Sequence, residues 1–136
     1  DRDRGHYVHP APEDFERAFA SMQKQRPDAL VVIENPMFFA NRAHLTELAA
    51  GLRRPAIYDV AEYVRSGGLM SHGASYADLI RRAATHVGKI LDGARPGDLP
   101  IEQPTTFELV INMKTAKALG LTISRSVLLR ADQVIE

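Results

Sequence analysis

The apolar run at residues 29–33 is the feature that most constrains the fold of this chain. It reads Ala-Leu-Val-Val-Ile and is followed by Glu34, Asn35 and Pro36. Continuous apolar runs rich in Val and Ile favour strands buried on both faces, which occur mainly in parallel sheets covered by helices. Asn35 can cap the next helix, and Pro36 suits its first position, where a missing N–H costs nothing. We therefore expect a strand, a polar tip and a helix start, the place where open parallel sheets bind ligands.

Composition narrows the class of protein. With 136 residues, 45% of them hydrophobic and 25% charged, the chain is one globular domain or part of one. Seventeen basic and seventeen acidic residues cancel, so no net field attracts nucleic acid or an anionic membrane. The absence of cysteine excludes disulfides, thiolate catalysis and cysteine-based zinc sites. Because the sequence opens on Asp-Arg-Asp-Arg without an initiator Met, we expect it to be cut from something longer.

Helical and strand patterns alternate along the chain. The first patterns predict a short strand at 6–9, a helix at 12–26, the strand at 29–33 and a helix at 36–50 ended by Gly51. Next come a strand at 56–59, a short helix at 60–64, a strand at 69–73 and a helix at 75–91, in which Ser75 and Asp78 have capping-box spacing. An extended connector at 94–105 then leads to a strand at 106–111, a helix at 114–119 capped by Asn112, and a helical segment at 126–135. This order predicts an α/β fold, a three-layer Rossmann-like parallel sheet with right-handed crossovers. The helices outnumber the strands, so we expect some of the sheet to lie outside this sequence.

Three stretches carry a family resemblance. Residues 99–123 (LPIEQPTTFELVINMKTAKALGLTI) and 129–136 (LRADQVIE) resemble the C-terminal signature of a family of ABC-transporter substrate-binding proteins. Residues 67–73 (GGLMSHG) are similar to the Gly-Gly-Leu-Met-Ser-Tyr-Gly segment of that family, with His72 in place of Tyr. The similarity covers residues 13–136.

The resemblance implies a fold and a set of partners. Members resemble type I periplasmic binding proteins, in which two Rossmann-like lobes close over a ligand, and they are about twice this length or more. The likeness makes this chain the C-terminal portion, with residues 28–66 in the second lobe, 69–93 crossing to the first lobe and 106–136 returning. It implies a small-molecule ligand, a membrane permease as partner, a periplasmic or extracytoplasmic location, and no cofactor. Such a fragment leaves sheet edges uncovered, so we expect it to self-associate or exchange elements with a second copy.

Seven residues are candidates for ligand contact because they stand at predicted strand tips. They are Glu34, Asn35 and Phe38 after the first buried strand, Tyr58 and Asp59 after the second, and Ser71 and His72 after the third. Their amide, carboxylate and hydroxyl groups suit the polar groups of an amino-acid-like ligand, and the aromatic rings can stack on its side chain.

Each candidate also has a purely structural explanation. Asn35 has about even odds of being a helix cap without a ligand role. Phe38 and its neighbour Phe39 fit a core position better than a ligand platform, by roughly two to one. Asp59 can cap the helix that starts near residue 60, and a His at a strand end such as His72 is about as often a satisfied structural residue as a ligand contact.

Catalytic and metal-binding patterns are weak. His6 and His9 are three residues apart in an irregular segment without a paired carboxylate, so a solvated pair is several times more probable than a zinc site. Ser71 and His72 are neighbours whose side chains point to opposite faces of a strand, so they cannot form a nucleophilic pair. Gly-rich phosphate loops are absent, and the paired arginines suit a solvated surface.

Three functions compete on these observations. The first is a solute-binding component of an ABC importer that closes over its ligand by hinge motion. The second is a ligand-sensing input domain of a signalling protein with the same fold. The third is a Rossmann-like hydrolase or transferase, for which Glu34 and His72 would be the only available acid–base couple.

Overall fold

The computed structural model describes residues 14–33 and 35–136, and in these ranges five strands form one sheet in the order β1-β2-β3-β4-β5. The strands are β1 (Leu30–Val32), β2 (Ala56–Tyr58), β3 (Met70–Ala74), β4 (Phe107–Asn112) and β5 (Gln133–Ile135). The pairs β1–β2, β2–β3 and β4–β5 are parallel, and β3–β4 is antiparallel. The predicted α/β class is confirmed, with one antiparallel pair that the alternating pattern did not indicate. The strand predicted at residues 6–9 lies outside the described residues.

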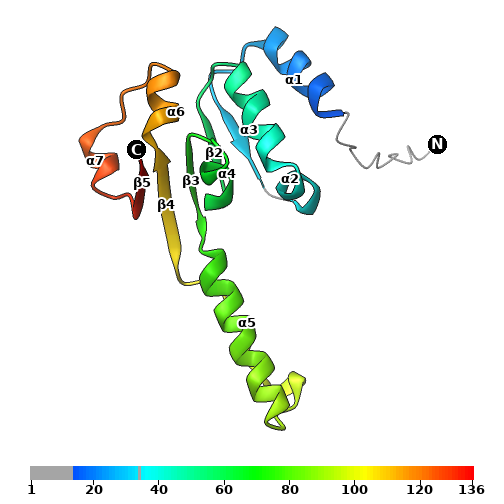
Figure 1. Ribbon diagram of the computed structural model, residues 1–136. Helices are drawn as coiled ribbons and strands as arrows, with labels where there is room; N and C mark the ends of the chain where they lie inside the picture. Colours follow the sequence, from blue (N-terminus) through cyan, green and yellow to red (C-terminus); the bar gives the residue numbers. More distant parts are fainter. Residues whose placement is uncertain (1–13, 34) are drawn as a thin grey trace, which may run out of the picture.

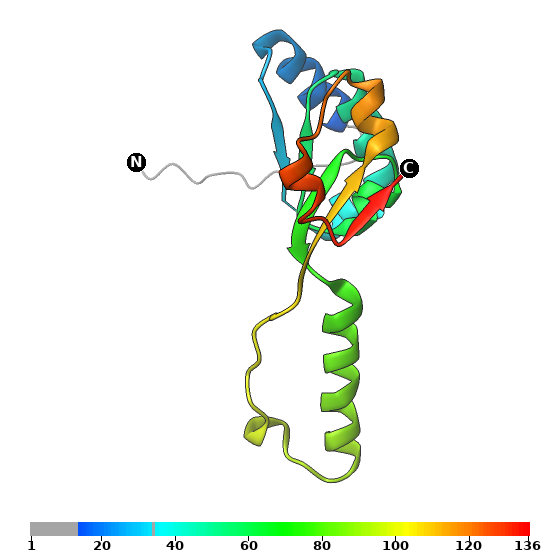
Figure 2. The ribbon, with the colours of Figure 1, turned by 90° about the vertical axis from the view of Figure 1, so that its left-hand side faces the viewer.

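Helices flank the sheet and one of them leaves it. The helices are α1 (Asp14–Gln25), α2 (Pro36–Ala40), α3 (Arg42–Gly51), α4 (Ala61–Arg65), α5 (Tyr76–Leu91), α6 (Met113–Ala118) and α7 (Arg125–Leu128), with a 3₁₀ turn η1 (Pro96–Asp98). In Figure 2, α6 and α7 lie on opposite sides of the sheet. Helix α5 points away from the sheet, and residues 94–106 return from its far end to β4 (Figures 1 and 2). We call residues 94–106 the connector.

The larger cluster of buried residues lies on one face of the sheet. The register aligns Tyr58 of β2 with Ser71 of β3 and Ser71 with Val110 of β4, and all three are buried. On this face, Phe15 of α1 and Leu45 of α3 cluster with Tyr58. The strand alternation sends every second side chain to the other face, as the pleat requires.

The prediction that β1 is buried on both faces is wrong within the described residues. Val31 is 75% exposed and Ile33, just after the strand, is 71% exposed. The physical reason is that β1 is the first strand of this sheet, so it pairs only with β2, and Val31 points to the face opposite the core. The apolar run therefore marks an uncovered edge here.

Two details of the second predicted helix differ. The helix at 36–50 is interrupted at Asn41, whose side-chain amide donates to the carbonyl oxygen of Met37 at 2.9 Å, and it divides into α2 and α3. Gly51 does not terminate it in the left-handed conformation. Gly51 is the last residue of α3, and the left-handed backbone occurs at Arg53, with a φ of 54°.

The predicted helical segment at 126–135 is wrong at its C-terminal end. The helical part is α7, and residues Gln133–Ile135 instead form β5 beside β4. Asp132 directs this pairing, because its Oδ2 accepts from the backbone N–H of Leu109 at 2.7 Å and its own N–H donates to the Leu109 carbonyl at 2.9 Å. A tertiary contact at one residue thus overrides the local helical pattern.

Helix α5 has the predicted bounds but no buried residue. Ser75 is its N-cap residue without a side-chain cap bond, so the predicted capping box is wrong, and Asp78 pairs with Arg81 and Arg82 instead. Four large apolar side chains of α5 are solvent-exposed, namely Ile80, Val87, Ile90 and Leu91, the last at 82%. No helix within the described ranges has the length and hydrophobicity needed to cross a bilayer.

Candidate functional site

The candidate site is the sheet edge at which β1, β2 and β3 end. These strands are parallel, so their carboxyl ends lie at one edge, and the antiparallel β4 begins there. Helix α5 and the connector leave the sheet at the same place (Figure 1). The last paired residues are Ala74 and Phe107, and beyond them the Ser75 N–H donates to the Thr106 carbonyl at 3.0 Å. We call this the carboxyl edge; ligands of open α/β sheets bind in this position.

Asn35 lies three residues past the end of β1 and caps the start of α2. Its side-chain oxygen accepts from the backbone N–H of Phe38 at 2.9 Å, and Pro36 occupies the first turn. The predicted cap is therefore confirmed. The bond uses the amide oxygen and leaves the amide NH₂ as the group that a ligand could meet. Glu34, the neighbouring candidate, lies outside the described residues.

Two adjacent phenylalanines point to different partners. Phe38 packs edge-on against Phe15 of α1, with ring centroids 5.6 Å apart, and belongs to the core as its structural explanation predicts. Phe39 instead packs against Tyr76, the first residue of α5, with ring centroids 5.7 Å apart. It also packs against Tyr63 of α4, with ring centroids 6.4 Å apart. Phe39 therefore joins α2 to the point at which α5 leaves the sheet.

Arg42 adds a cationic group to this edge. Its guanidinium carbon lies 4.9 Å from the Phe39 ring centroid, and its Nη1 donates to the Phe39 carbonyl at 3.0 Å. Stacking on an aromatic ring while bonded to a carbonyl restricts the guanidinium before any ligand arrives. An oriented Arg can bind a carboxylate in two-point fashion.

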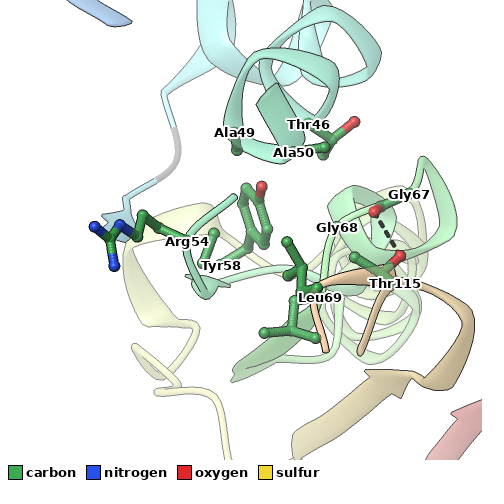
Figure 3. Close-up of a pocket in the computed structure, with 11 residues that line it drawn as sticks. Thr46, Ala49, Ala50, Arg54, Tyr58, Gly67, Gly68, Leu69 and Thr115 are labelled. Atoms are coloured by element: carbon green, nitrogen blue, oxygen red, sulfur yellow. Dashed lines mark hydrogen bonds between the residues drawn. The ribbon is translucent and has the colours of Figure 1, made fainter. Parts of the chain in front are cut away.

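Tyr58 is a core residue rather than a rim residue. It is 2% exposed and stacks on Tyr63, with ring centroids 4.9 Å apart and an interplanar angle of 11°. Burial raises the pKa of Tyr58 to about 12. Figure 3 shows its hydroxyl directed toward α3, and β2 sends its side chain to the core face. This placement does not offer Tyr58 to a ligand at the carboxyl edge.

The cavity that Tyr58 lines is too small for a solute. It lies near the start of β2 and β3, at the opposite edge of the sheet, where Thr115 of α6 donates to the Gly67 carbonyl at 2.9 Å (Figure 3). Its volume is about 10 Å³, roughly the space that one water molecule needs. A ligand pocket is larger, on the order of 300–1,000 Å³.

Ser71 and His72 separate as the strand alternation predicts. Ser71 is fully buried on the core face, whereas His72 is exposed on the other face. The His72 ring stacks on Phe107 of the neighbouring strand, with centroids 6.3 Å apart and an interplanar angle of 16°. Phe107 is 54% exposed, so the pair presents a flat surface beside the carboxyl edge. Ser71, like Tyr58, is not presented at this edge.

Asp59 is half-buried in the bend that follows β2. Val60, and not Asp59, is the N-cap residue of α4. The Asp59 backbone instead packs against β3. A Cβ added to Gly73 would lie 1.7 Å from the Asp59 carbonyl oxygen, so the tips of β2 and β3 are in direct contact.

Two further hollows differ in chemistry from the carboxyl edge. A groove of about 300 Å³ between α1 and β1 is lined by apolar side chains, Phe19 and Leu30 among them, and it lacks the polar groups that orient a solute. A groove of about 340 Å³ lies between the end of α3 and α6, beside Lys114. Across residues 14–33 and 35–136, no group of three or more His, Cys, Asp or Glu side chains could hold a metal ion.

Sequence reasoning missed three residues of the carboxyl edge. Arg42 was assigned to the middle of a continuous helix, and only the break at Asn41 places it at the edge. Tyr76 falls at the start of the predicted helix at 75–91, and no local pattern signals its contact to Phe39. Phe107 pairs with His72 only through the antiparallel register of β3 and β4, which no local pattern signals.

Comparison with known proteins agrees with this geometry. Residues 7–135 match the family model described as ABC transporter substrate binding protein. A domain from Streptococcus pneumoniae solved in complex with L-Trp is 28% identical, with a TM-score of 0.84 over 93% of this chain and 42% of that one. A conserved domain protein from Vibrio cholerae is 26% identical, with a TM-score of 0.81 over 90% of this chain and 41% of that one.

A third solved structure shares the fold. The ligand-free, open structure of a substrate-binding protein with adhesive properties from Clostridium difficile is 20% identical, with a TM-score of 0.61 over 90% of this chain and 41% of that one. The chain thus spans about two fifths of the length of the solved structures that it matches. No curated protein matches the sequence.

Proposed function

Because the chain belongs to the ABC transporter substrate-binding protein family, we propose that it acts as part of the solute-binding component of an ABC importer. Members of this family are binders rather than enzymes, so the hydrolase or transferase alternative is set aside. The observation that carries the proposal is the family match over residues 7–135, together with a carboxyl edge that gathers cationic, amide and aromatic groups.

The proposed organisation is that of a type I periplasmic binding protein. Residues 28–66 belong to the second lobe, residues 69–93 cross to the first lobe, and residues 106–136 return. The geometry supports this, because α5 and the connector leave one edge of the sheet and run side by side (Figure 2). A ligand that contacts the carboxyl edge and the facing lobe favours the closed form by its greater affinity for that form.

The proposed ligand is amino-acid-like or aromatic, with a carboxylate group. The Streptococcus pneumoniae structure contains L-Trp, and this chain has groups suited to such a molecule. The Arg42 guanidinium, held by Phe39, binds the carboxylate, while the exposed ring pair of His72 and Phe107 supplies a stacking surface. Asn35 and Asp59 offer an amide and a carboxylate at the same edge, and Glu34 remains a predicted contact.

The partners follow from the family. An importer needs a membrane permease to receive the solute, and a separate subunit hydrolyses ATP, so this chain needs no cofactor. Substrate-binding members are typically extracytoplasmic, and we propose the same location here. The exposed Val31 of β1 and the exposed Leu91 of α5 support self-association when the chain is produced by itself.

Titration calorimetry tests the proposed function. The protein is produced at the length that its gene encodes and titrated with L-tryptophan, L-phenylalanine, L-leucine and the aromatic acid indole-3-acetate. We expect at least one to bind, and Arg42→Gln to weaken the affinity roughly tenfold, as loss of a charge-assisted hydrogen bond does. Lys114→Gln, in the groove beside α6, is the matched control and leaves the affinity unchanged. Failure of every compound to bind would contradict the proposal.

A further inference from the structure

One guanidinium joins α5 to the connector. Arg82 lies on α5, and its Nε is 2.9 Å from Asp78 Oδ2 on the same helix. Its Nη1 is 3.2 Å from Glu102 Oε2 on the connector, and its Nη2 donates to the Thr105 hydroxyl. Three nitrogen atoms of Arg82 thus reach three residues. Two of these, Glu102 and Thr105, lie 20 and 23 residues further along the chain, beyond the end of α5.

Neighbouring side chains reinforce this junction. The second oxygen of Glu102 lies 4.0 Å from His86 Nε2, one helical turn beyond Arg82. The His86 Nδ1 atom is buried and has no hydrogen-bond partner among the described residues. The Arg82 hydrogen bond holds the pKa of Asp78 below its usual value, with a further contribution from a hydrogen bond to Thr106. Asp78 is therefore ionised at neutral pH and pairs with Arg82 as a full charge.

The contacts of Arg82 lie just beyond the point at which backbone pairing between β3 and β4 ends. The β3–β4 ladder stops at Ala74 and Phe107, followed by the hydrogen bond from Ser75 to Thr106. Beyond that point the connector runs back along α5 at a distance from the sheet (Figure 2). Between these segments, the Arg82 side chain continues the connection that the ladder began.

We propose that Arg82, with Asp78, Glu102 and Thr105, clasps the connector to α5, so that the two segments move as one arm relative to the sheet. The arm then bends where the ladder ends, at residues 74–75 and 106–107. Arg82 is a positioning residue in this arrangement, since it lies away from the groups at the carboxyl edge. The clasp would make hinge motion a single rotation instead of two independent ones.

The absence of cysteine from the sequence gives a direct test. Cysteines introduced at Ile101, which is 99% exposed on the connector, and at Leu129, which is 76% exposed beside the sheet, carry one spin label each. The doubly labelled 136-residue chain is mixed with a large excess of unlabelled chain, so that double electron–electron resonance gives the distribution of distances between connector and sheet within one copy. With the clasp intact we expect a narrow distribution of distances. Arg82→Gln removes the charged bonds to the connector, so the connector moves more freely and the distribution broadens about twofold.

Arg81→Gln is the matched control, since Arg81 pairs with Asp78 at 3.2 Å but does not contact the connector. It leaves the distribution unchanged. Glu102→Gln removes the charge on the connector without touching α5, and it broadens the distribution less than Arg82→Gln does because Thr105 still bonds to Arg82. Arg82→Lys retains the charge but cannot reach three partners, so it restores the width only in part. Circular dichroism shows that α5 stays helical in each variant. Equal widths for Arg82→Gln and Arg81→Gln, or no change in Glu102→Gln, would overturn the proposal.

Discussion

The backbone carbonyl of Asp59 occupies the space in which residue 73 would carry a side chain. A Cβ placed on Gly73 would lie 1.7 Å from the Asp59 oxygen and 2.7 Å from its carbon, and both atoms belong to backbone that cannot rotate away. The bend after β2 therefore rests directly on β3, one residue before the ladder ends at Ala74. This contact fixes where α5 leaves the sheet relative to the carboxyl edge.

A methyl group at residue 73 should be strongly destabilising. Gly73→Ala forces β2 and β3 apart, and we expect it to lower the free energy of unfolding by at least about 3 kcal/mol, the range for strained core substitutions. Gly88→Ala is the matched control, because nothing lies within 4 Å of a Cβ there. That residue is inside α5, where Ala stabilises a helix by roughly 0.5–1 kcal/mol relative to Gly. Urea unfolding measures both, and equal stability of the two variants would contradict the close contact.

Tyr58 should make the protein sensitive to alkali. Burial raises the pKa of Tyr58 from the usual 10 to about 12 in the folded state. A raised folded pKa means that this residue contributes its full stability below pH 10, the unfolded value, and loses the contribution as pH rises toward 12. Ultraviolet titration of phenolate formation should show a late phase whose amplitude Tyr58→Phe reduces. A Tyr58→Phe variant with the same late phase would assign the phase to another tyrosine.

Ser71 should be replaceable without cost. Its hydroxyl is buried and has no hydrogen-bond partner within the described ranges, so Ser71→Ala should be neutral or stabilising by up to about 1 kcal/mol. Thr46 is the contrasting case, because its hydroxyl lies 2.8 Å from the Ala43 carbonyl and 2.9 Å from the Ser66 carbonyl. Thr46→Val should cost about 1–2 kcal/mol. Chemical denaturation compares them, and a larger loss for Ser71→Ala would mean that its hydroxyl is bonded.

Asn35 allows its two roles to be separated. Asn35→Ala removes the bond to the Phe38 N–H and should cost about 1 kcal/mol of stability. Asn35→Asp keeps the cap, since Asp caps helices as well as Asn does, but it replaces the amide NH₂ by a charge. Unchanged stability with weaker binding of a carboxylate ligand in Asn35→Asp would support a ligand contact. Unchanged binding would leave Asn35 as a cap alone.

Local chemistry allowed two of the helix caps to be predicted. Asn35 and Asn112 each accept from a backbone N–H three residues ahead, at 2.9 and 3.1 Å, as their positions before a helix indicate. The opposite orientations of Ser71 and His72 followed from the two-residue period of a strand. Such features depend on neighbours in the sequence, which is why they can be read without a structure.

Features that depend on distant residues were predicted poorly. The strand β5 exists because Asp132 bonds to Leu109, 23 residues earlier, and the local pattern there favoured a helix. Tyr58 is the last residue of β2, as expected, but its side chain turns to the core face and stacks on Tyr63. Arg42 reached the candidate site only because Asn41 breaks a helix. At β5, a tertiary contact decided between local alternatives of similar energy.

The central claim is that a solute binds at the carboxyl edge of this sheet, and amide chemical-shift mapping tests it most directly. The protein at its gene-encoded length, labelled with ¹⁵N, is titrated with L-tryptophan and with any compound that binds in calorimetry. The account predicts that the largest shifts occur at Asn35, Phe39, Arg42 and His72. Shifts concentrated instead around Thr46, Gly67 and Thr115 at the opposite edge, or no shifts with any of the compounds, would contradict it.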